Sequence, residues 1–218
     1  MSLIQFSKTK TQLFLEKSLS QNELVGLSQS ITNAYSAVDA FYKSTPALGA
    51  FMVGGDLRSH LLRVFVEYSL QKYADVNAGF THEVRPNVAN NCNHLRLYKN
   101  DLALTSHYMG AKCERLEARS ALHKANLVER NGNLFELEES DADIFRNIGY
   151  AQIMHGGISK PLNILINIPS RDQLTIIGTM QLAIVTENKT QVEKIIDEMP
   201  FKLNDTIKEL KNGNKKIS

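Results

Sequence analysis

The sequence contains no tryptophan, only two cysteines and no long hydrophobic run. No apolar stretch approaches the roughly 20 residues that a membrane-spanning helix needs. The N-terminal stretch MSLIQFSKTKTQLF lacks the apolar core and the small-residue cleavage site of a secretory signal. Cys92 and Cys113 do not form a C-x-x-C pair, which argues against a zinc ribbon or a thioredoxin-type redox site. We therefore expect a cytoplasmic protein with free thiols and no membrane partner.

The charges are nearly balanced, and the composition is that of a globular protein. The 25 lysines and arginines and the 23 aspartates and glutamates leave a formal net charge of +2, too small to indicate a nucleic-acid partner by itself. Hydrophobic residues make up 43% of the 218 residues, and no internal repeat or low-complexity linker divides the chain. We therefore expect a single domain spanning residues 1–218.

The chain up to about residue 75 shows the spacing of amphipathic helices. Ser20 and Glu23 form a Ser-x-x-Glu capping box, in which each side chain binds an amide of the first helical turn. Apolar residues then recur at three- and four-residue steps, at Leu24, Leu27, Ile31, Tyr35, Val38 and Tyr42. Pro46 predicts the end of this helix, and Asp56 is a candidate cap for a second one.

Strand patterns dominate from about residue 76 to about residue 210. GFTHEVR predicts a strand, NHLRLYKNDLALTSH a hairpin, and IGYAQIMH, LNILINI and QLTIIGTMQLAIV three further β-rich segments. The segment beginning GAKCERLEARS has helical spacing, and TQVEKIIDEM predicts a closing helix with a Thr190–Glu193 capping box. The expected fold is α+β: a mainly antiparallel sheet with N-terminal helices, a central basic helix and a C-terminal helix.

The hairpin carries the strongest local cluster of reactive side chains. A two-residue turn at Asn100-Asp101 places His94 opposite His107 and Arg96 opposite Thr105, with the leucines on the other face. Two imidazoles can act as acid and base near neutral pH, and a guanidinium can hold a phosphate. The alternatives are that this is simply the solvent-facing side of a sheet, or that a three-residue turn separates the two histidines.

A basic stripe is predicted on the helix that follows the hairpin. Its members recur at three- and four-residue steps, at Lys112, Arg115, Arg119, His123, Asn126 and Arg130. Such a stripe suits phosphate contacts along a nucleic-acid backbone. The alternative is that it forms the solvated face of an amphipathic helix.

MHGGISKP, residues 154–161, is a third candidate site. His155 ends a predicted strand, and two glycines, Ser159 and Lys160 follow it, a combination that can form an anion-binding nest. A Gly-Gly turn between two strands explains the same residues without a ligand. The segment lacks the G-x-x-x-x-G-K-[ST] spacing of a nucleotide-binding loop, and the chain contains no H-E-x-x-H, so we expect no cofactor and no metal site.

Together these patterns lead to a functional hypothesis and one alternative. The hypothesis is a protein that acts on RNA or DNA, such as a metal-independent ribonuclease or a toxin-like effector. Its catalytic candidates are His94, His107 and His155, and its phosphate-binding candidates are Arg96, Lys112, Arg115, Arg119, His123, Arg130 and Lys160. The alternative is a non-enzymatic regulatory module that forms a homo-oligomer or binds a protein partner through its N-terminal helices. A second apolar stripe on the first long helix, hinted at by Val25 with Ala37 or Ala40, would favour it.

Overall fold

The computed structural model describes residues 10–46, 52–86, 93–113, 131, 149–170 and 175–199. Its helices are α1 (Lys10–Ser18), α2 (Gln21–Ser44), α4 (Met52–Val76) and α6 (Lys189–Glu198). Its strands are β1 (Thr81–Pro86), β2 (Asn93–Lys99), β3 (Leu102–Tyr108), β4 (Gly149–Gly157), β5 (Pro161–Pro169) and β6 (Ile176–Gln181). These elements confirm the predicted α+β fold with helices before the sheet and one after it. None of the described helices has both the length and the apolar character needed to cross a membrane.

The six strands form one sheet in the order β1-β2-β3-β4-β5-β6. Every neighbouring pair is antiparallel except β3 and β4, which are parallel. The prediction of a mainly antiparallel sheet is therefore confirmed. Because parallel neighbours need a crossover connection, the chain between β3 and β4 returns from one end of the sheet to the other. Most of that connection lies outside the described residues.

Helix α2 begins and ends where its sequence predicts. The backbone N–H of Ser20 donates to Glu23 Oε2 at 2.8 Å, and the N–H of Glu23 donates to Ser20 Oγ at 3.4 Å. This reciprocal pair is the predicted capping box. The helix ends at Ser44, just before Pro46. Residues in its middle turns are buried, among them Leu27, Ile31, Ala34, Tyr35, Ala37 and Val38.

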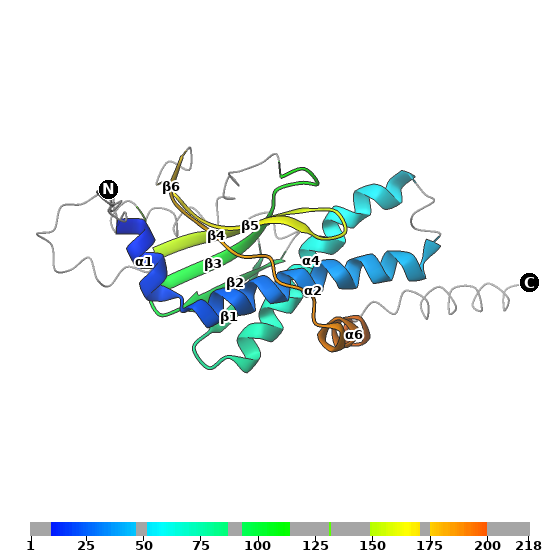
Figure 1. The fold of residues 1–218 in the computed structure, drawn as a ribbon, viewed down its shortest axis with the longest axis horizontal. Coiled ribbons are helices and arrows are strands. Elements are labelled where there is room, and N and C mark those ends of the chain that lie inside the picture. The colour runs from blue at the N-terminus through cyan, green and yellow to red at the C-terminus, as the bar shows by residue number, and fades with distance from the viewer. Residues whose placement is uncertain are drawn as a thin grey trace, which may run out of the picture.

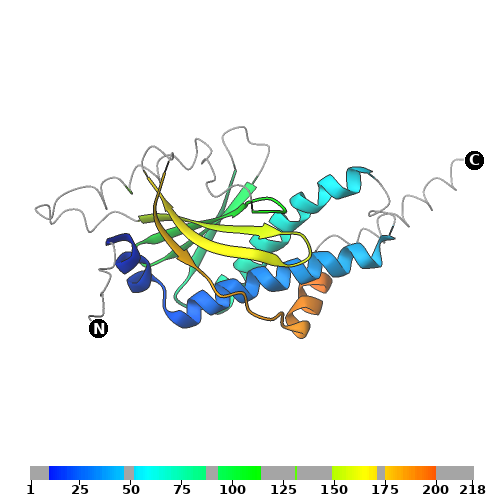
Figure 2. The same ribbon diagram turned by 45° about the horizontal axis from the view of Figure 1, so that its top comes forward.

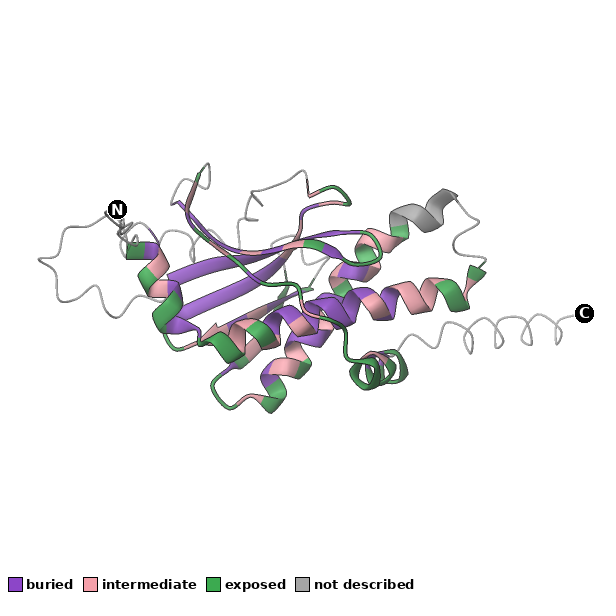
Figure 3. Cartoon of the chain, in the orientation of Figure 1, coloured by how far each residue is buried: buried purple, intermediate pink, exposed green. Residues whose placement is uncertain are grey.

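Helices α2 and α4 pack against each other and cover the same face of the sheet (Figures 1 and 2). The main apolar core lies between these layers and includes Leu95, Leu97, Leu102 and Leu104 of the hairpin. Each such leucine contributes about 1.5–3 kcal/mol by leaving water. Figure 3 shows that β3, β4 and the middle of α2 are the most continuously buried elements. Because these leucines point toward the helices, the side chains that alternate with them on β2 and β3 point to the other face of the sheet.

Two predicted helix starts differ from the observed ones. Helix α4 begins at Met52, so Asp56 lies inside the helix and does not cap it. Each of the two glycines before Asp56 lowers helix stability by about 1 kcal/mol relative to alanine, but glycine can still adopt helical backbone angles. The low helix propensity of these glycines therefore does not mark the start of α4. Helix α6 is capped by Asn188 and not by Thr190, because Asn188 Oδ1 accepts the N–H of Gln191 at 3.2 Å. The backbone N–H of Asn188 also donates to Asn33 of α2 at 2.8 Å, which fixes this residue at the start of the helix.

Candidate active site

The hairpin has the two-residue turn that its sequence predicts. Backbone pairing joins Lys99 with Leu102 and Leu97 with Leu104, and Asn100 takes the left-handed conformation with φ of 50°. Asparagine tolerates this conformation well, which is why it suits such turns. The backbone pairing ends at Leu97 and Leu104, so the placement of Arg96 opposite Thr105 and of His94 opposite His107 stays a prediction. His94, Arg96, Thr105 and His107 alternate with the leucines along the two strands and therefore belong to the face opposite the helices.

His107 is held by two hydroxyl groups on β3 and β4. Its Nε2 atom lies 2.8 Å from Thr105 Oγ1 and 3.4 Å from the phenolic oxygen of Tyr150. The two hydroxyl oxygens are themselves 2.7 Å apart, and Gln152 Nε2 donates to the Tyr150 oxygen at 3.5 Å. A hydroxyl can donate or accept a hydrogen bond. This cluster can therefore accommodate His107 in either protonation state, as an acid–base residue requires.

A second cluster lies on β1 and β2. Arg96 Nε donates to His94 Nε2 at 3.2 Å, and Arg96 lies 3.6 Å from the carboxylate of Glu83 on the paired strand. The hydroxyl of Tyr98 donates to Glu83 Oε1 at 2.5 Å, and this bond lowers the pKa of Glu83. Burial in turn raises the pKa of Tyr98. The Arg96 side chain is only 14% exposed, so its guanidinium is held in place on the sheet by an imidazole and a carboxylate.

Tyr98 connects the two clusters. Its ring packs on Ala103 and Tyr150, which form a small apolar cluster on this face, separate from the main core. Asn131 fixes the start of β4 beside it: Asn131 Nδ2 donates to the carbonyl of Tyr150 at 2.9 Å, and Tyr150 N donates back to Asn131 Oδ1 at 2.7 Å. The buried side-chain amide of Asn131 therefore fixes the backbone of Tyr150. In this way it also helps to position the Tyr150 hydroxyl that contacts His107.

A row of polar side chains continues from this cluster across the sheet. Strand pairing places Thr105 next to Gln152, Gln152 next to Asn167, and Asn167 next to Thr179, whose hydroxyl donates to Asn167 Oδ1 at 3.0 Å. We call these four residues the polar row. Thr105, Gln152 and Asn167 are only 2%, 2% and 1% exposed. Burying a polar group costs free energy unless it is hydrogen-bonded, and hydrogen bonds to Tyr150 and within the row offset that cost here.

Sequence analysis missed Tyr150, Gln152, Asn167 and Thr179 as site residues. Two of these residues could have been noticed in the sequence, because each is a polar residue within an otherwise apolar strand segment. Gln152 lies in IGYAQIMH, and Asn167 lies in LNILINI. Glu83 was likewise not among the predicted site residues. Among the described residues, no three histidine, cysteine, aspartate or glutamate side chains lie close enough together to hold a metal ion.

His155 lies on the other face of the sheet. Its Nδ1 atom shares a hydrogen bond of 3.0 Å with the hydroxyl of Tyr35 on α2, and the ring is fully buried. Burial lowers the pKa of His155 to about 3, so the imidazole is neutral at neutral pH. His155 and Gln152 differ by an odd number of positions along β4, which is why they face opposite sides. The three predicted catalytic histidines therefore do not share one cleft.

The MHGGISKP segment forms the end of the β4–β5 hairpin. The guanidinium of Arg58 donates to the carbonyl of Ile158 at 3.2 Å and to Asp39 Oδ1 at 3.0 Å, and Ser159 also bonds to Asp39. Gly157 has φ of 135°, a conformation that disfavours a side chain. A Cβ at Gly156 would lie 2.6 Å from Cys113 Sγ. The backbone conformation of Gly157 and the close contact at Gly156 therefore account for both glycines without a ligand. Lys160 is exposed at the turn.

The predicted basic stripe begins at Lys112, and its other members follow the last described residue of this segment, Cys113. Arg115, Arg119, His123, Asn126 and Arg130 lie outside the described residues. Lys112 is described and is exposed in the turn after β3.

No family model, no curated protein and no solved structure matches this chain. The function of the site is therefore inferred from the chemistry of its residues alone.

Proposed function

We propose that the protein cleaves RNA without a metal ion, at the face of the sheet that carries His94, Arg96 and His107. The observation that supports this most directly is the pair of hydrogen-bonded clusters on this face. His107 sits against two hydroxyls that can exchange a proton with it, and an arginine contacts the second histidine on the neighbouring strand. The polar row lies beside these clusters on the same face of the sheet, and its members on β3, β4 and β5 are buried.

These side chains supply what RNA cleavage by proton transfer requires. One imidazole removes the proton of a ribose 2′-hydroxyl, and the 2′-oxygen attacks the adjacent phosphorus. The bond from phosphorus to the 5′-oxygen breaks as the second imidazole donates a proton to that oxygen. The products are a 2′,3′-cyclic phosphate and a 5′-hydroxyl. Arg96 would stabilise the charge on the phosphate, and general acid–base catalysis of this kind contributes about 10²–10⁴ in rate.

Cleavage of a labelled single-stranded RNA in excess EDTA tests this proposal. His107→Ala and His94→Ala should each lower the rate about 100-fold or more, because each removes one of the two proton-transfer groups. His60→Ala is a matched control, since His60 is exposed on α4 and outside the site. Its rate should equal that of the wild type. A wild-type protein that leaves diverse RNA sequences intact, or a His107→Ala variant that retains full activity, would overturn the proposal.

The alternative hypothesis of a binding module depends on an exposed apolar stripe on α2. Ala37 is buried within the chain and Ala40 is half-buried, and among the described large apolar side chains of α2 only Val25, at 42%, is exposed. The buried face of α2 packs against α4, α6 and the sheet of the same chain. No observation on this helix therefore favours self-association over the enzymatic proposal.

A further inference from the structure

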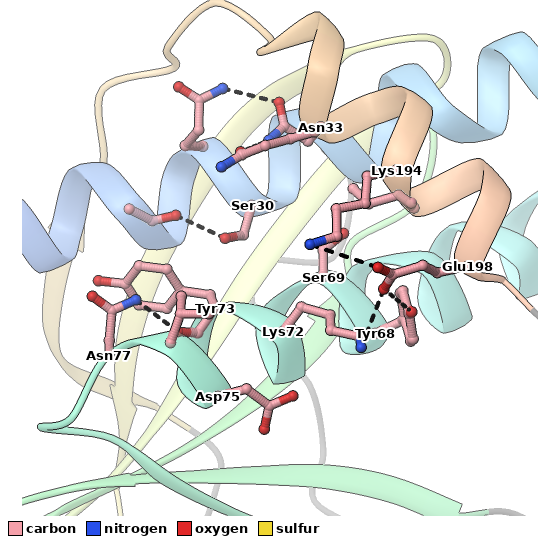
Figure 4. Close-up of a pocket in the computed structure, with 15 residues that line it drawn as sticks. Ser30, Asn33, Tyr68, Ser69, Lys72, Tyr73, Asp75, Asn77, Lys194 and Glu198 are labelled. Carbon is pink, nitrogen blue, oxygen red and sulfur yellow. Dashed lines mark hydrogen bonds and ion pairs between the residues drawn. The ribbon is translucent and has the colours of Figure 1, made fainter.

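A cavity of about 460 Å³ lies where α2, the C-terminal half of α4 and α6 meet (Figure 4). This volume is within the range of about 300–1,000 Å³ that is usual for small-molecule sites. All of its lining residues come from the helical segments and the residue that follows α4, whereas His94 and His107 lie on the strands. The cavity is therefore separate from the candidate active site.

The charged side chains that line the cavity balance one another. Lys72 and Lys194 supply two positive charges, and Asp75 and Glu198 supply two negative charges. Glu198 pairs with Lys72 at 3.1 Å and with Lys194 at 3.6 Å, and Figure 4 shows these side chains gathered at one carboxylate. Asp75 Oδ1 lies 2.8 Å from Nε2 of His82. Because the charges are balanced and already paired within the chain, the cavity suits an uncharged ligand.

Two hydroxyl groups on the α4 wall lack a hydrogen bond. Ser69 is only 4% exposed, and its buried hydroxyl has no partner among the described residues. The hydroxyl of Tyr73, one turn further along α4, likewise makes no hydrogen bond within the described part of the chain. A buried hydroxyl without a partner is unfavourable, and a ligand that bonds to it would remove that cost.

A chain of carboxamides adds two more such groups, on the α2 and α6 walls. Gln29 Nε2 donates to the carbonyl of Thr186 at 2.7 Å and to Asn33 Oδ1 at 3.0 Å. Asn33 Oδ1 also accepts the backbone N–H of Asn188 at 2.8 Å, so Asn33 Nδ2 donates to Gln191 Oε1 at 2.6 Å. Gln29 Oε1 remains as an acceptor at one end of this chain and Gln191 Nε2 as a donor at the other end. A ligand that uses both must therefore present hydrogen-bonding atoms on two of its sides.

The ring of Tyr73 gives the cavity an aromatic surface in a fixed position. It lies against Gly26 so closely that a Cβ at Gly26 would collide with it. On the sheet side it makes an edge contact with Phe80, with the ring centroids 5.4 Å apart. These two contacts hold the ring in place while its hydroxyl lacks a partner. A tyrosine in this setting offers a ligand both an apolar surface and a polar tip.

We infer that this cavity binds an uncharged sugar. A sugar carries hydroxyl groups around its whole ring, and each of them can donate or accept a hydrogen bond. It can therefore meet the Ser69 hydroxyl, the Gln29 acceptor and the Gln191 donor on three separate walls. The C–H groups on the face of a sugar can pack on the ring of Tyr73. This inference does not depend on the proposed RNA cleavage, since it uses none of the same residues.

Calorimetric titration of the full chain with glucose, galactose, mannose and fructose tests the inference. At least one of these should bind with a Kd below about 5 mM, a weak affinity that a few hydrogen bonds can supply. The phosphorylated form of the same sugar should bind no more tightly, because the cavity has no positive charge in excess. The inference fails if none of the four sugars binds, or if the phosphorylated form binds more tightly than the neutral sugar.

Two variants of α4 locate the binding in this cavity. Ser69→Ala removes a hydroxyl that has no partner, so the Tm of the ligand-free protein should not fall, whereas sugar affinity should fall about fivefold. Tyr73→Phe keeps the ring and removes its hydroxyl, and should weaken binding by a similar factor. Ser59→Ala is the matched control, because Ser59 lies on the same helix and does not line the cavity. Wild-type sugar affinity in both Ser69→Ala and Tyr73→Phe, or an equal loss in Ser59→Ala, would overturn the assignment.

Discussion

The Nε2 atom of His107 lies 2.8 Å from the hydroxyl oxygen of Thr105, and that oxygen lies 2.7 Å from the hydroxyl of Tyr150. Thr105 and Tyr150 are buried, while His107 is half-buried. The imidazole is thus the member of this chain of hydrogen bonds with most access to solvent. Both hydroxyls can act as hydrogen-bond donor or acceptor. The hydrogen bonds from His107 to Thr105 and from Thr105 to Tyr150 can therefore be kept when His107 gains or loses a proton.

Removing the Tyr150 hydroxyl should therefore change catalysis more than stability. We expect Tyr150→Phe to lower kcat for RNA cleavage about tenfold and to shift its pH–rate profile, because His107 loses a group that positions it. KM should change little. Tyr42→Phe, which changes a half-buried tyrosine away from the site, should match the wild type in both respects. An unchanged pH profile in Tyr150→Phe would show that this hydroxyl has only a structural role.

Replacing Arg96 with lysine should weaken the binding of RNA. A guanidinium can donate to His94 and face Glu83 at the same time, whereas one ammonium group on a flexible chain cannot reproduce that geometry. We expect Arg96→Lys to raise KM for RNA about tenfold in steady-state measurements. Arg85→Lys is the control on the neighbouring strand, since Arg85 pairs with the same Glu83 but is 59% exposed. Equal KM values for the two variants would contradict a phosphate-binding role for Arg96.

The buried His155 should make stability depend on pH. Its folded pKa of about 3 lies below the unfolded value of about 6.5, so in mildly acid solution the unfolded state binds a proton that the folded state does not. Its contribution is complete above about pH 6.5 and is lost as pH falls toward 3, at about 1.4 kcal/mol per pH unit. We expect urea denaturation between pH 7 and pH 4 to show a shallower loss for His155→Gln than for the wild type. Parallel losses in the two proteins would contradict this account.

The capping box of α2 should contribute measurably to stability. Ser20→Ala removes the acceptor of the Glu23 N–H and should lower the free energy of unfolding by about 1 kcal/mol. Ser44→Ala is the control at the other end of the helix, where the hydroxyl donates to the carbonyl of Phe41, and should cost less than about 0.5 kcal/mol. Chemical denaturation of both variants checks the difference. Equal losses would mean that the cap bond is not the source of the stabilisation.

Local patterns predicted those parts of the fold whose physics is local. The Ser20 cap and the turn at Asn100 are both set by a few adjacent residues, and both are confirmed. The pairing of β3 with β4 is not local, because about 40 residues separate the strands and no turn fixes their register. Thr190 and Asn188 are both good helix caps, and contact with Asn33 on a distant helix selects Asn188.

The candidate site was only partly predictable for the same reason. The alternation along β4 already implies that Gln152 and His155 face opposite sides of the sheet. Both faces of this strand are buried, however, so the sequence does not show which side the helices cover. The link between His107 and Tyr150 depends on the β3–β4 pairing and could not be found before that pairing was known.

The end groups of the RNA products test the central claim most directly. Wild-type protein in excess EDTA should cut a synthetic RNA into fragments that end in a 2′,3′-cyclic phosphate and begin with a 5′-hydroxyl, as mass spectrometry can identify. An all-deoxy strand of the same sequence should remain intact, because it lacks the attacking hydroxyl. Fragments with 5′-phosphate ends, or a cleavage activity that EDTA abolishes, would contradict the account.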